Sequence, residues 1–250
     1  MAGHSHWAGI KHKKALIDNK RGKVWSRLSK AIIVAAKMGG GDPDANIRLR
    51  KAIDDAKSVS MPKENIERAI KRGTGEIEGG DVEEIVYEGY GPGGVAIMCE
   101  IMTDNRNRTA PEIRLLFSKH NGNLGSTGCV SYLFDRKGLF VFADGTDEER
   151  LMEVAMEHGG DNIETNEQGK LQVTCEPENF AALAEALQAA GLVVEFNEVT
   201  RIAQTEVELD SETARGALKL LEMLDDHDDV QNVSTNLRLS EELMAELNRG

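Results

Sequence analysis

Aromatic residues are scarce in this chain, and long runs of apolar residues are missing. Phe, Trp and Tyr make up 4% of the 250 residues, so aliphatic side chains and Ala must fill the hydrophobic cores. No stretch approaches the roughly 18–20 consecutive apolar residues that a membrane-spanning helix needs. The N-terminus also lacks the apolar centre of a secretory signal. These absences predict a cytoplasmic protein that does not act at a membrane.

Cysteine is rare as well, which excludes two classes of stabilising site. Cys99, Cys129 and Cys175 lie far apart and form no C-x-x-C pair, so neither a disulfide framework nor a cysteine zinc site is expected. Each is expected to serve as a small core hydrophobe. The spacing of His4 and His6 with His12 matches no structural zinc pattern. We therefore expect no metal and no other cofactor.

Motifs for catalysis are also absent. The chain contains no nucleophile elbow, no H-E-x-x-H and no Walker pattern. The triple glycine at 39–41 precedes an expected helix, as a phosphate-binding turn does. It follows another helix rather than a strand, however, and lacks the Gly-Lys-Ser/Thr ending, so a plain interhelical turn is favoured. The sequence predicts a protein that is not an enzyme.

The charges are distributed unevenly along the chain. A net charge of −13 would ordinarily argue against nucleic acid as a partner. However, residues 1–75 hold 17 Lys and Arg against 7 Asp and Glu, a net charge of +10, whereas the remainder holds 13 against 36, a net charge of −23. Such a field attracts polyanions to one end and repels them from the rest. We therefore expect oriented binding of a polyanion by the first segment, and a protein partner for the acidic C-terminal domains.

Three amphipathic helices are expected in the first 75 residues, after a basic arm. Apolar residues recur at spacings of three and four over 24–35, and similar patterns follow over 44–57 and 62–72. Asp42 is a suitable N-cap for the second helix. Three short helices in about 50 residues predict a small bundle.

The periodicity then changes to that of strands. Strands are expected at 85–87 and 95–102 on either side of a Gly-Pro-Gly-Gly turn, followed by a helix that ends at Asn121-Gly122. A further strand is expected near 130–134. From 135 to 203 the order becomes βαββαβ, which is the ferredoxin-like arrangement.

These patterns predict an α+β fold with three domains. We expect an N-terminal three-helix bundle plus two ferredoxin-like α+β domains, one inserted in the other. The expected boundaries are 1–75 for the basic arm and helical bundle, 82–134 with 204–240 for a discontinuous α+β domain, and 135–203 for the inserted βαββαβ domain.

The most basic segment is Ile10–Lys30, which holds eight Lys and Arg and the single acid Asp18. Such cations neutralise phosphates and release condensed counterions. If about five of them contact phosphate, the slope of log K against log salt is roughly −4 to −5 for duplex DNA. The alternative is a solvated charged face, but the segment lacks local ion-pair partners. The predicted nucleic-acid-binding residues are Lys11, His12, Lys13, Lys14, Lys20, Arg21, Lys23, Arg27 and Lys30.

A second polar patch comprises Asn105, Arg106 and Arg108, at the expected start of a helix. The two arginines are suited to phosphate or to an acidic partner surface. The alternative is that these residues cap the helix and form internal ion pairs.

The second and third helices of the bundle also have the spacing of a helix-turn-helix. The third helix exposes Lys63, Arg68 and Lys71, but also Glu64 and Glu67, and the turn contains no glycine. Base-specific readout by this helix is therefore weakly supported, and phosphate contact by the arm and first helix is the favoured mode.

Several long motifs resemble those of the YebC family of probable transcriptional regulators, which also includes the mitochondrial translational activator of cytochrome c oxidase. The matching stretches are MAGHSHW at Met1, KHKKA at Lys11, KRGK at Lys20, AAKMGGGDPDAN at Ala35, MPKENIERAIKRG at Met61, YEGYGPGG at Tyr87, TDNRNRT at Thr103 and GNLGSTGCVSYLF at Gly122. The last hundred residues match mainly in pattern and length.

The resemblance implies three domains, namely a helical bundle and two α+β domains. It implies DNA binding and transcriptional control for some bacterial members, and action on the translating ribosome for others. The basic residues from Lys11 to Lys30 would form the nucleic-acid face. His6 stands where the family usually has Lys, and Gly9 and Ile17 replace more polar residues, so this arm is slightly less cationic. We therefore predict a DNA-binding transcriptional regulator; the alternative is a ribosome-associated translational activator that acts on rRNA or tRNA.

Overall fold

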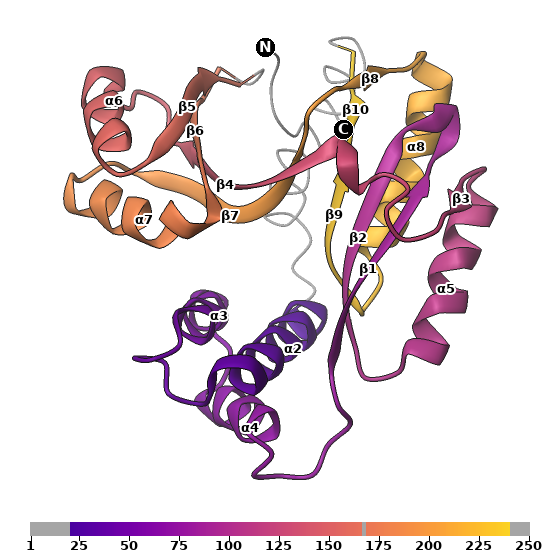
Figure 1. Ribbon diagram of the computed structural model, residues 1–250, viewed down its shortest axis with the longest axis horizontal. Helices are drawn as coiled ribbons and strands as arrows, with labels where there is room; N and C mark the ends of the chain where they lie inside the picture. The colour runs from indigo at the N-terminus through magenta and orange to yellow at the C-terminus, as the bar shows by residue number, and fades with distance from the viewer. Residues whose placement is uncertain (1–20, 167–168, 241–250) are drawn as a thin grey trace. The chain divides into compact units, whose positions relative to one another are not determined.

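The computed structural model describes residues 21–166 and 169–240 and shows an α+β fold, as predicted. The described chain divides into two compact units, one made of residues 21–129 and 215–233 and the other of residues 130–214 and 234–240. The helical bundle and the first sheet thus belong to one unit (Figure 1). The three predicted domain boundaries stay a prediction. No helix within the described ranges has both the length and the apolar character to cross a bilayer.

The bundle consists of α2 (Arg21–Gly39), α3 (Ile47–Ser58) and α4 (Lys63–Gly73). Apolar residues spaced three and four apart turn one face of each helix inward. They form a core of aliphatic side chains that is joined by Val82 and Met102 from the first sheet region. Its buried members from the helices are Ile32, Ile33, Val34, Ala35, Ala36, Leu49, Ala52, Ile53, Ala56, Ile66 and Ala69.

The second helix begins four residues later than Asp42 predicted. Asn46 is its N-cap, and the Asn46 side chain accepts a hydrogen bond from the Leu49 amide. The same buried amide group donates to the carbonyls of Ala35 and Gly40, so it also closes the turn after α2. The Asp42 carboxylate instead accepts from the Asp44 amide within that turn. The prediction of Asp42 as the cap was wrong because its side chain closes this local turn.

The first sheet has the strand order β3-β1-β2-β9. Strands β1 (Glu83–Tyr90) and β2 (Ala96–Thr103) form the expected antiparallel hairpin, joined through a 3-10 turn at Pro92–Gly94 in which Gly93 and Gly94 have positive φ. Strand β9 (Val230–Thr235) comes from the end of the chain and lies beside β2, so the sheet is built from two distant segments. Along the chain the elements of this sheet region follow in the order β1, β2, α5, β3, α8 and β9, which differs from the order of a βαββαβ unit. The fourth strand is β3 (Asn123–Leu124).

Helices α5 (Arg106–Lys119) and α8 (Ser211–Asp225) accompany this sheet (Figure 1). Phe117 of α5 and Leu220 of α8 are fully buried. A Cβ at Gly122 would lie 2.8 Å from the Tyr90 carbonyl oxygen and within about 3.2 Å of both side chains, so only glycine lets the two helices and the hairpin meet here.

The second unit contains the sheet β5-β6-β4-β7, the order of a ferredoxin-like unit. Helices α6 and α7 share its apolar core with the strands, and the rings of Phe140 and Phe180 stack at 4.8 Å between centroids. The elements are β4 (Phe134–Phe142), α6 (Glu148–Glu157), β5 (Gly160–Thr165), β6 (Leu171–Cys175), α7 (Phe180–Ala189) and β7 (Val194–Ala203). The strand predicted near 130–134 was wrong in one respect: Ser131–Leu133 form a 3-10 turn, and the strand begins at Phe134.

Two short strands complete this unit. Strand β8 (Val207–Glu208) pairs in parallel with β10 (Leu237–Arg238). The strands β4 and β7, which carry the chain into and out of the ferredoxin-like sheet, are antiparallel neighbours from Phe134 opposite Ala203 onward. The two ends of the 134–203 segment therefore lie side by side.

Candidate nucleic-acid interface

Helix α2 carries a stripe of three predicted nucleic-acid-binding cations. Lys23, Arg27 and Lys30 are spaced four and three residues apart, which places them on one side of an α-helix. Opposite them lies a segment that we call the acidic turn, residues Asp225–Asp229 between α8 and β9. All three cations contact this turn.

The contact at Lys30 is the most buried of the three. Its ammonium group forms an ion pair with Oδ1 of Asp229, whose side chain is 1% exposed, and it also donates to the carbonyl of Asp228 at 3.1 Å. A carboxylate with so little access to water is stable only when its oxygens are fully hydrogen-bonded. Lys30 supplies one of those bonds.

The other oxygen of Asp229 is held by the first sheet and α5. Oδ2 accepts from Arg108 Nη2 at 2.7 Å, from the Thr109 hydroxyl at 2.7 Å and from the Thr103 hydroxyl at 3.2 Å. The Asp229 carbonyl accepts from the amide of Met102 at 2.9 Å. Burial by itself raises the pKa of Asp229, but the hydrogen bonds from Lys30, Thr109 and Arg108 outweigh it and hold that pKa well below its usual range.

The contacts of Arg27 and Lys23 are looser. Arg27 Nη1 lies 3.8 Å from Asp225 Oδ1, and the buried Arg27 Nε has no hydrogen-bond partner in the part of the chain that the structure describes. Lys23 donates to the Asp226 carbonyl at 2.8 Å, while its ammonium group stays 3.9 Å from the carboxylate of Asp228. At 3.8 and 3.9 Å the side chains form ion pairs but no direct hydrogen bonds with each other.

The structure therefore places three of the nine predicted residues against acids of the same chain. Arg21 is the first residue of α2. The predicted residues Lys11, His12, Lys13, Lys14 and Lys20 lie outside the described residues. The basic segment lacks local ion-pair partners, but the α2 stripe has distant partners about 200 residues later in the chain.

The second polar patch is divided by the structure. Asn105 is the N-cap of α5 and accepts from the Arg108 amide, and the Arg108 guanidinium is part of the Asp229 network. The hydrogen bond to Asp229 raises the pKa of Arg108. Arg106 is exposed. Asn105 and Arg108 therefore match the alternative interpretation, in which these residues cap the helix and form internal ion pairs.

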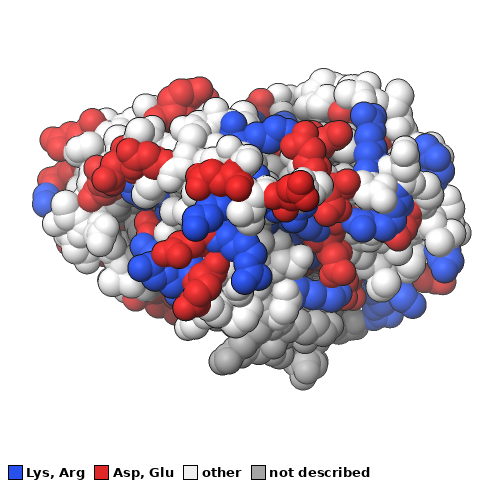
Figure 2. Space-filling view, turned by 90° about the horizontal axis from the view of Figure 1, so that it is seen from below, with Lys and Arg blue, Asp and Glu red and all other residues white. Residues whose placement is uncertain are grey.

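The third bundle helix presents charges of both signs. Lys63 pairs with Glu67 at 3.5 Å, and Arg68 and Lys71 are exposed beside Glu64. On the face of the molecule drawn in Figure 2, Lys and Arg side chains lie among Asp and Glu rather than forming one broad positive surface. A recognition helix that approaches the acidic major groove would need a more uniform face.

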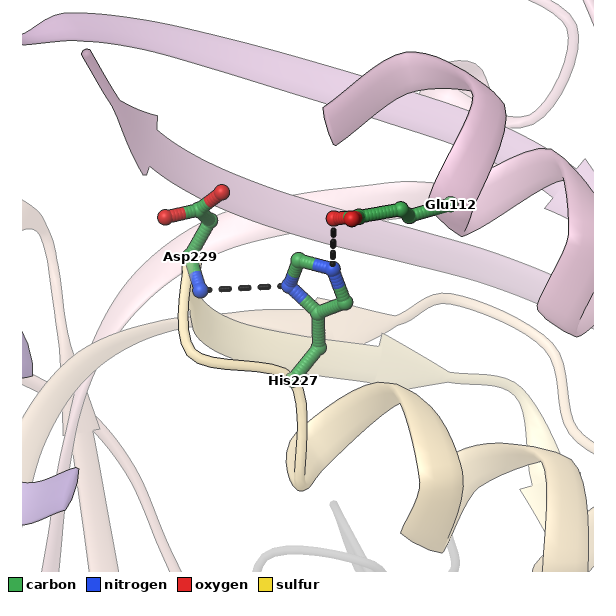
Figure 3. A group of neighbouring side chains, drawn as sticks. All are labelled: Glu112, His227 and Asp229. Atoms are coloured by element: carbon green, nitrogen blue, oxygen red, sulfur yellow. Dashed lines mark hydrogen bonds and ion pairs between the residues drawn. The ribbon is translucent and has the colours of Figure 1, made fainter. Parts of the chain in front are cut away.

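Glu112, His227 and Asp229 form the one group among the described residues with the spacing of a metal site. His227 Nδ1 accepts from the backbone amide of Asp229 at 3.1 Å, so its Nε2 carries the proton and donates to Glu112 Oε2 at 3.0 Å. In Figure 3 the Asp229 carboxylate points away from the ring. Because both ring nitrogens are hydrogen-bonded and Asp229 is held by cations, the group fits a structural network better than a metal centre.

The acidic turn is the part of this site that was not predicted from the sequence. Its sequence, Asp-Asp-His-Asp-Asp, is the densest run of acids in the chain, and that density was the available signal. Which cations it would meet depends on the pairing of β9 with β2, which no local pattern reveals. The cysteines, by contrast, are free as expected, with Cys99 and Cys175 buried.

Comparisons with known proteins agree with this fold. A probable transcriptional regulatory protein of Rhodopirellula baltica is 64% identical over 246 residues, covering 98% of this chain and all of the relative. One from Geobacter sulfurreducens is 54% identical over 247 residues, covering 99% of this chain and all of that relative. The crystal structure of a conserved hypothetical protein from Aquifex aeolicus matches with a TM-score of 0.86 and 49% identity, over 96% of this chain and 99% of that one.

Two family models account for nearly the whole described chain. Residues 5–76 match the TACO1/YebC protein N-terminal domain, and residues 82–237 match the TACO1/YebC second and third domain. The boundary between the two models falls in the acidic linker between α4 and β1. The chain belongs to the TACO1/YebC family.

Proposed function

We propose that this protein is a non-enzymatic regulator of gene expression that binds nucleic acid in the cytoplasm through its basic N-terminal arm, and that its target is DNA. The observation that carries the proposal is the segregation of charge, with +10 over residues 1–75 and −23 over the rest. The names of the relatives, probable transcriptional regulatory proteins, support a role in transcription.

We place the first phosphate contacts in the arm, because the predicted cations of α2 already have acidic partners. Lys23, Arg27 and Lys30 already have acidic partners, so Lys11, Lys13, Lys14 and Lys20 are the cations with which the protein first meets phosphate. Four phosphate contacts give a salt slope of about −3 to −4 on duplex DNA, shallower than the full basic segment would give.

A titration with labelled nucleic acid tests the proposal. Full-length protein is titrated into duplex DNA and into tRNA at several salt concentrations, and the slope of log K against log salt is measured. Replacing Lys13 and Lys14 by Gln should weaken binding and make the slope shallower by about 2, because two phosphate contacts are lost.

The matched control is Lys57→Gln with Lys63→Gln, which removes two exposed lysines of the bundle that already pair with neighbouring acids. The control should bind like the unaltered protein. Equal weakening by both pairs of substitutions would mean that only net charge matters, and the proposed arm site would be abandoned.

The ribosome-associated alternative is favoured by one observation, the mixed charge of α4, which suits contact with a phosphate backbone better than reading of bases. A preference of at least a hundredfold for one duplex over random DNA supports the transcriptional role. Comigration of the protein with ribosomes in a lysate gradient, together with no preferred duplex, would move the assignment to translation.

A further inference from the structure

The three ion pairs between α2 and the acidic turn differ in strength along the helix. Lys30 and Asp229 form a buried pair supported by three further hydrogen bonds to Oδ2. Arg27 and Lys23, one and two turns nearer the arm, reach carboxylates at 3.8 and 3.9 Å. The stripe is thus fixed at Lys30, whereas the ion pairs of Arg27 and Lys23 are longer and Lys23 keeps a hydrogen bond of 2.8 Å to the Asp226 carbonyl.

We propose that the acidic turn is an autoinhibitory contact: Asp225 and Asp228 occupy Arg27 and Lys23 in place of phosphate, and bound nucleic acid displaces them while Lys30 stays on Asp229. The inference rests on the proposed function, since it concerns the same basic segment. In this inference Lys23 and Arg27 contact phosphate in the complex, whereas in the free protein they contact the acidic turn.

The chemistry of Arg27 favours the exchange. A guanidinium group binds phosphate through two parallel N–H bonds, yet here the contact from Nη1 to Asp225 Oδ1 is 3.8 Å long and the buried Nε lacks a partner among the described residues. A phosphate oxygen would satisfy the Nε donor that the acidic turn leaves without a partner. The folded chain thus holds Arg27 with a carboxylate in poor hydrogen-bonding geometry.

The exposure of Lys23 favours the exchange as well. Its side chain is 41% exposed and that of Asp228 is 68% exposed, so water screens their attraction. Lys23 also lies nine residues after Lys14, on the part of α2 nearest the arm in sequence. A polyanion that first meets the arm therefore reaches Lys23 and Arg27 before it reaches the buried pair at Lys30.

The test removes the two competing carboxylates. In full-length protein, Asp225→Asn with Asp228→Asn should raise the affinity for random-sequence duplex DNA about five- to tenfold, because neither exchange then requires breaking an ion pair. The control Glu157→Gln with Glu178→Gln removes two exposed charges from the other compact unit and corrects for the change in net charge. A gain no larger than that of the control overturns the inference.

A second set of variants identifies the cations concerned. Adding Lys23→Gln and Arg27→Gln to the Asn pair should abolish the gain, whereas the same two substitutions in the unaltered protein should have a smaller effect. Hydrogen exchange of the 225–228 amides should also increase when DNA is added. A gain that survives the loss of Lys23 and Arg27 contradicts the proposal.

The outcomes separate this inference from the proposed function. If the unaltered protein binds DNA and loses binding with Lys13→Gln and Lys14→Gln, but the Asn pair changes nothing, the arm site stands and the autoinhibitory contact is wrong. If neither the unaltered protein nor the Asn pair binds any nucleic acid, both fail.

Discussion

Asp229 brings together residues from three elements of the chain. Its carboxylate contacts Lys30 of α2, Thr103 of β2, and Arg108 and Thr109 of α5, while Asp229 itself immediately precedes β9. Removing one member of such a network leaves the others buried without a partner. The residue thus matters more for stability than its single negative charge suggests.

We expect Asp229→Asn to lower the free energy of unfolding by about 3–5 kcal/mol, the usual cost of breaking a buried ion pair. Urea denaturation at pH 7 measures this change. Asp226→Asn is the control, because the Asp226 contact in the structure is made by its backbone carbonyl. A loss below about 1 kcal/mol for Asp229→Asn would mean that the network contributes little.

Acid should lower the free energy of unfolding through protonation of Asp229. The pKa of Asp229 is lowered in the folded state, so its contribution is fully present above the unfolded pKa of about 4 and is lost as the pH falls below that value. Unfolding free energies measured between pH 7 and pH 2.5 should fall more steeply for the unaltered protein than for Asp229→Asn. Parallel curves would contradict this assignment.

Residue chemistry was predictable from the sequence only in part. The cysteines were expected to be small core residues, and Cys99 and Cys175 are buried, whereas Cys129 is only half-buried. Which of the basic residues face acids was not predictable, because Lys30 and Asp229 are 199 residues apart. Charge counting within a window finds cations but not the distant carboxylates that neutralise them.

At the scale of elements, the turn between α2 and α3 depends on one buried amide side chain. Asn46 caps α3 and also holds the carbonyls of Ala35 and Gly40. A Cβ at Gly39 would lie 2.6 Å from its Nδ2, which explains why glycine occupies that position. The triple glycine therefore serves packing and turn geometry, as an interhelical turn does.

We expect Asn46→Ala to destabilise the protein by about 1–2 kcal/mol, since it removes a cap and leaves buried carbonyls unpaired. Thermal and urea unfolding measure the effect. Asp42→Ala, at the other candidate cap, should cost less than about 0.5 kcal/mol because that side chain is solvent-accessible in the turn. The reverse order of the two variants would favour the cap that sequence alone suggested.

Most helices and strands were predictable because their apolar periods are clear. The hairpin, the three bundle helices and the βαββαβ order all follow from spacing and turn residues. The errors lie where two signals compete. Asp42 suits both a cap and a turn. The segment 130–134 has the composition of a strand, although Ser131–Leu133 form a 3-10 turn and β4 begins at Phe134. Local composition does not decide between such alternatives.

At the scale of the whole molecule, the ferredoxin-like segment joins the rest of the chain at two neighbouring points. The Gln204 amide donates to the Leu133 carbonyl at 2.9 Å, and Phe134 lies opposite Ala203. The α+β class and the order of elements were predictable from pattern. The register at this junction was not, since it depends on long-range pairing.

We expect that replacing residues 134–203 with two glycines leaves the bundle and the first sheet folded. The junction needs to span only one interstrand distance, so the short bridge introduces little strain. A cooperative unfolding transition and retained hydrogen-exchange protection of β1 and β2 check this outcome. Loss of protection in β2 would show that the first sheet depends on the inserted segment.

The neighbouring ends also bear on how the chain folds. Strands β2 and β9 must find each other across the whole of the intervening sequence, and closing a loop costs conformational entropy that grows with the logarithm of its length. Once β4 has paired with β7, residues 134–203 no longer add to the length of the loop between β2 and β9. The effective length of that loop is then roughly halved. The saving is about 0.6 kcal/mol, which corresponds to about a threefold faster closure. Early folding of residues 134–203 would thus favour the pairing of β2 with β9.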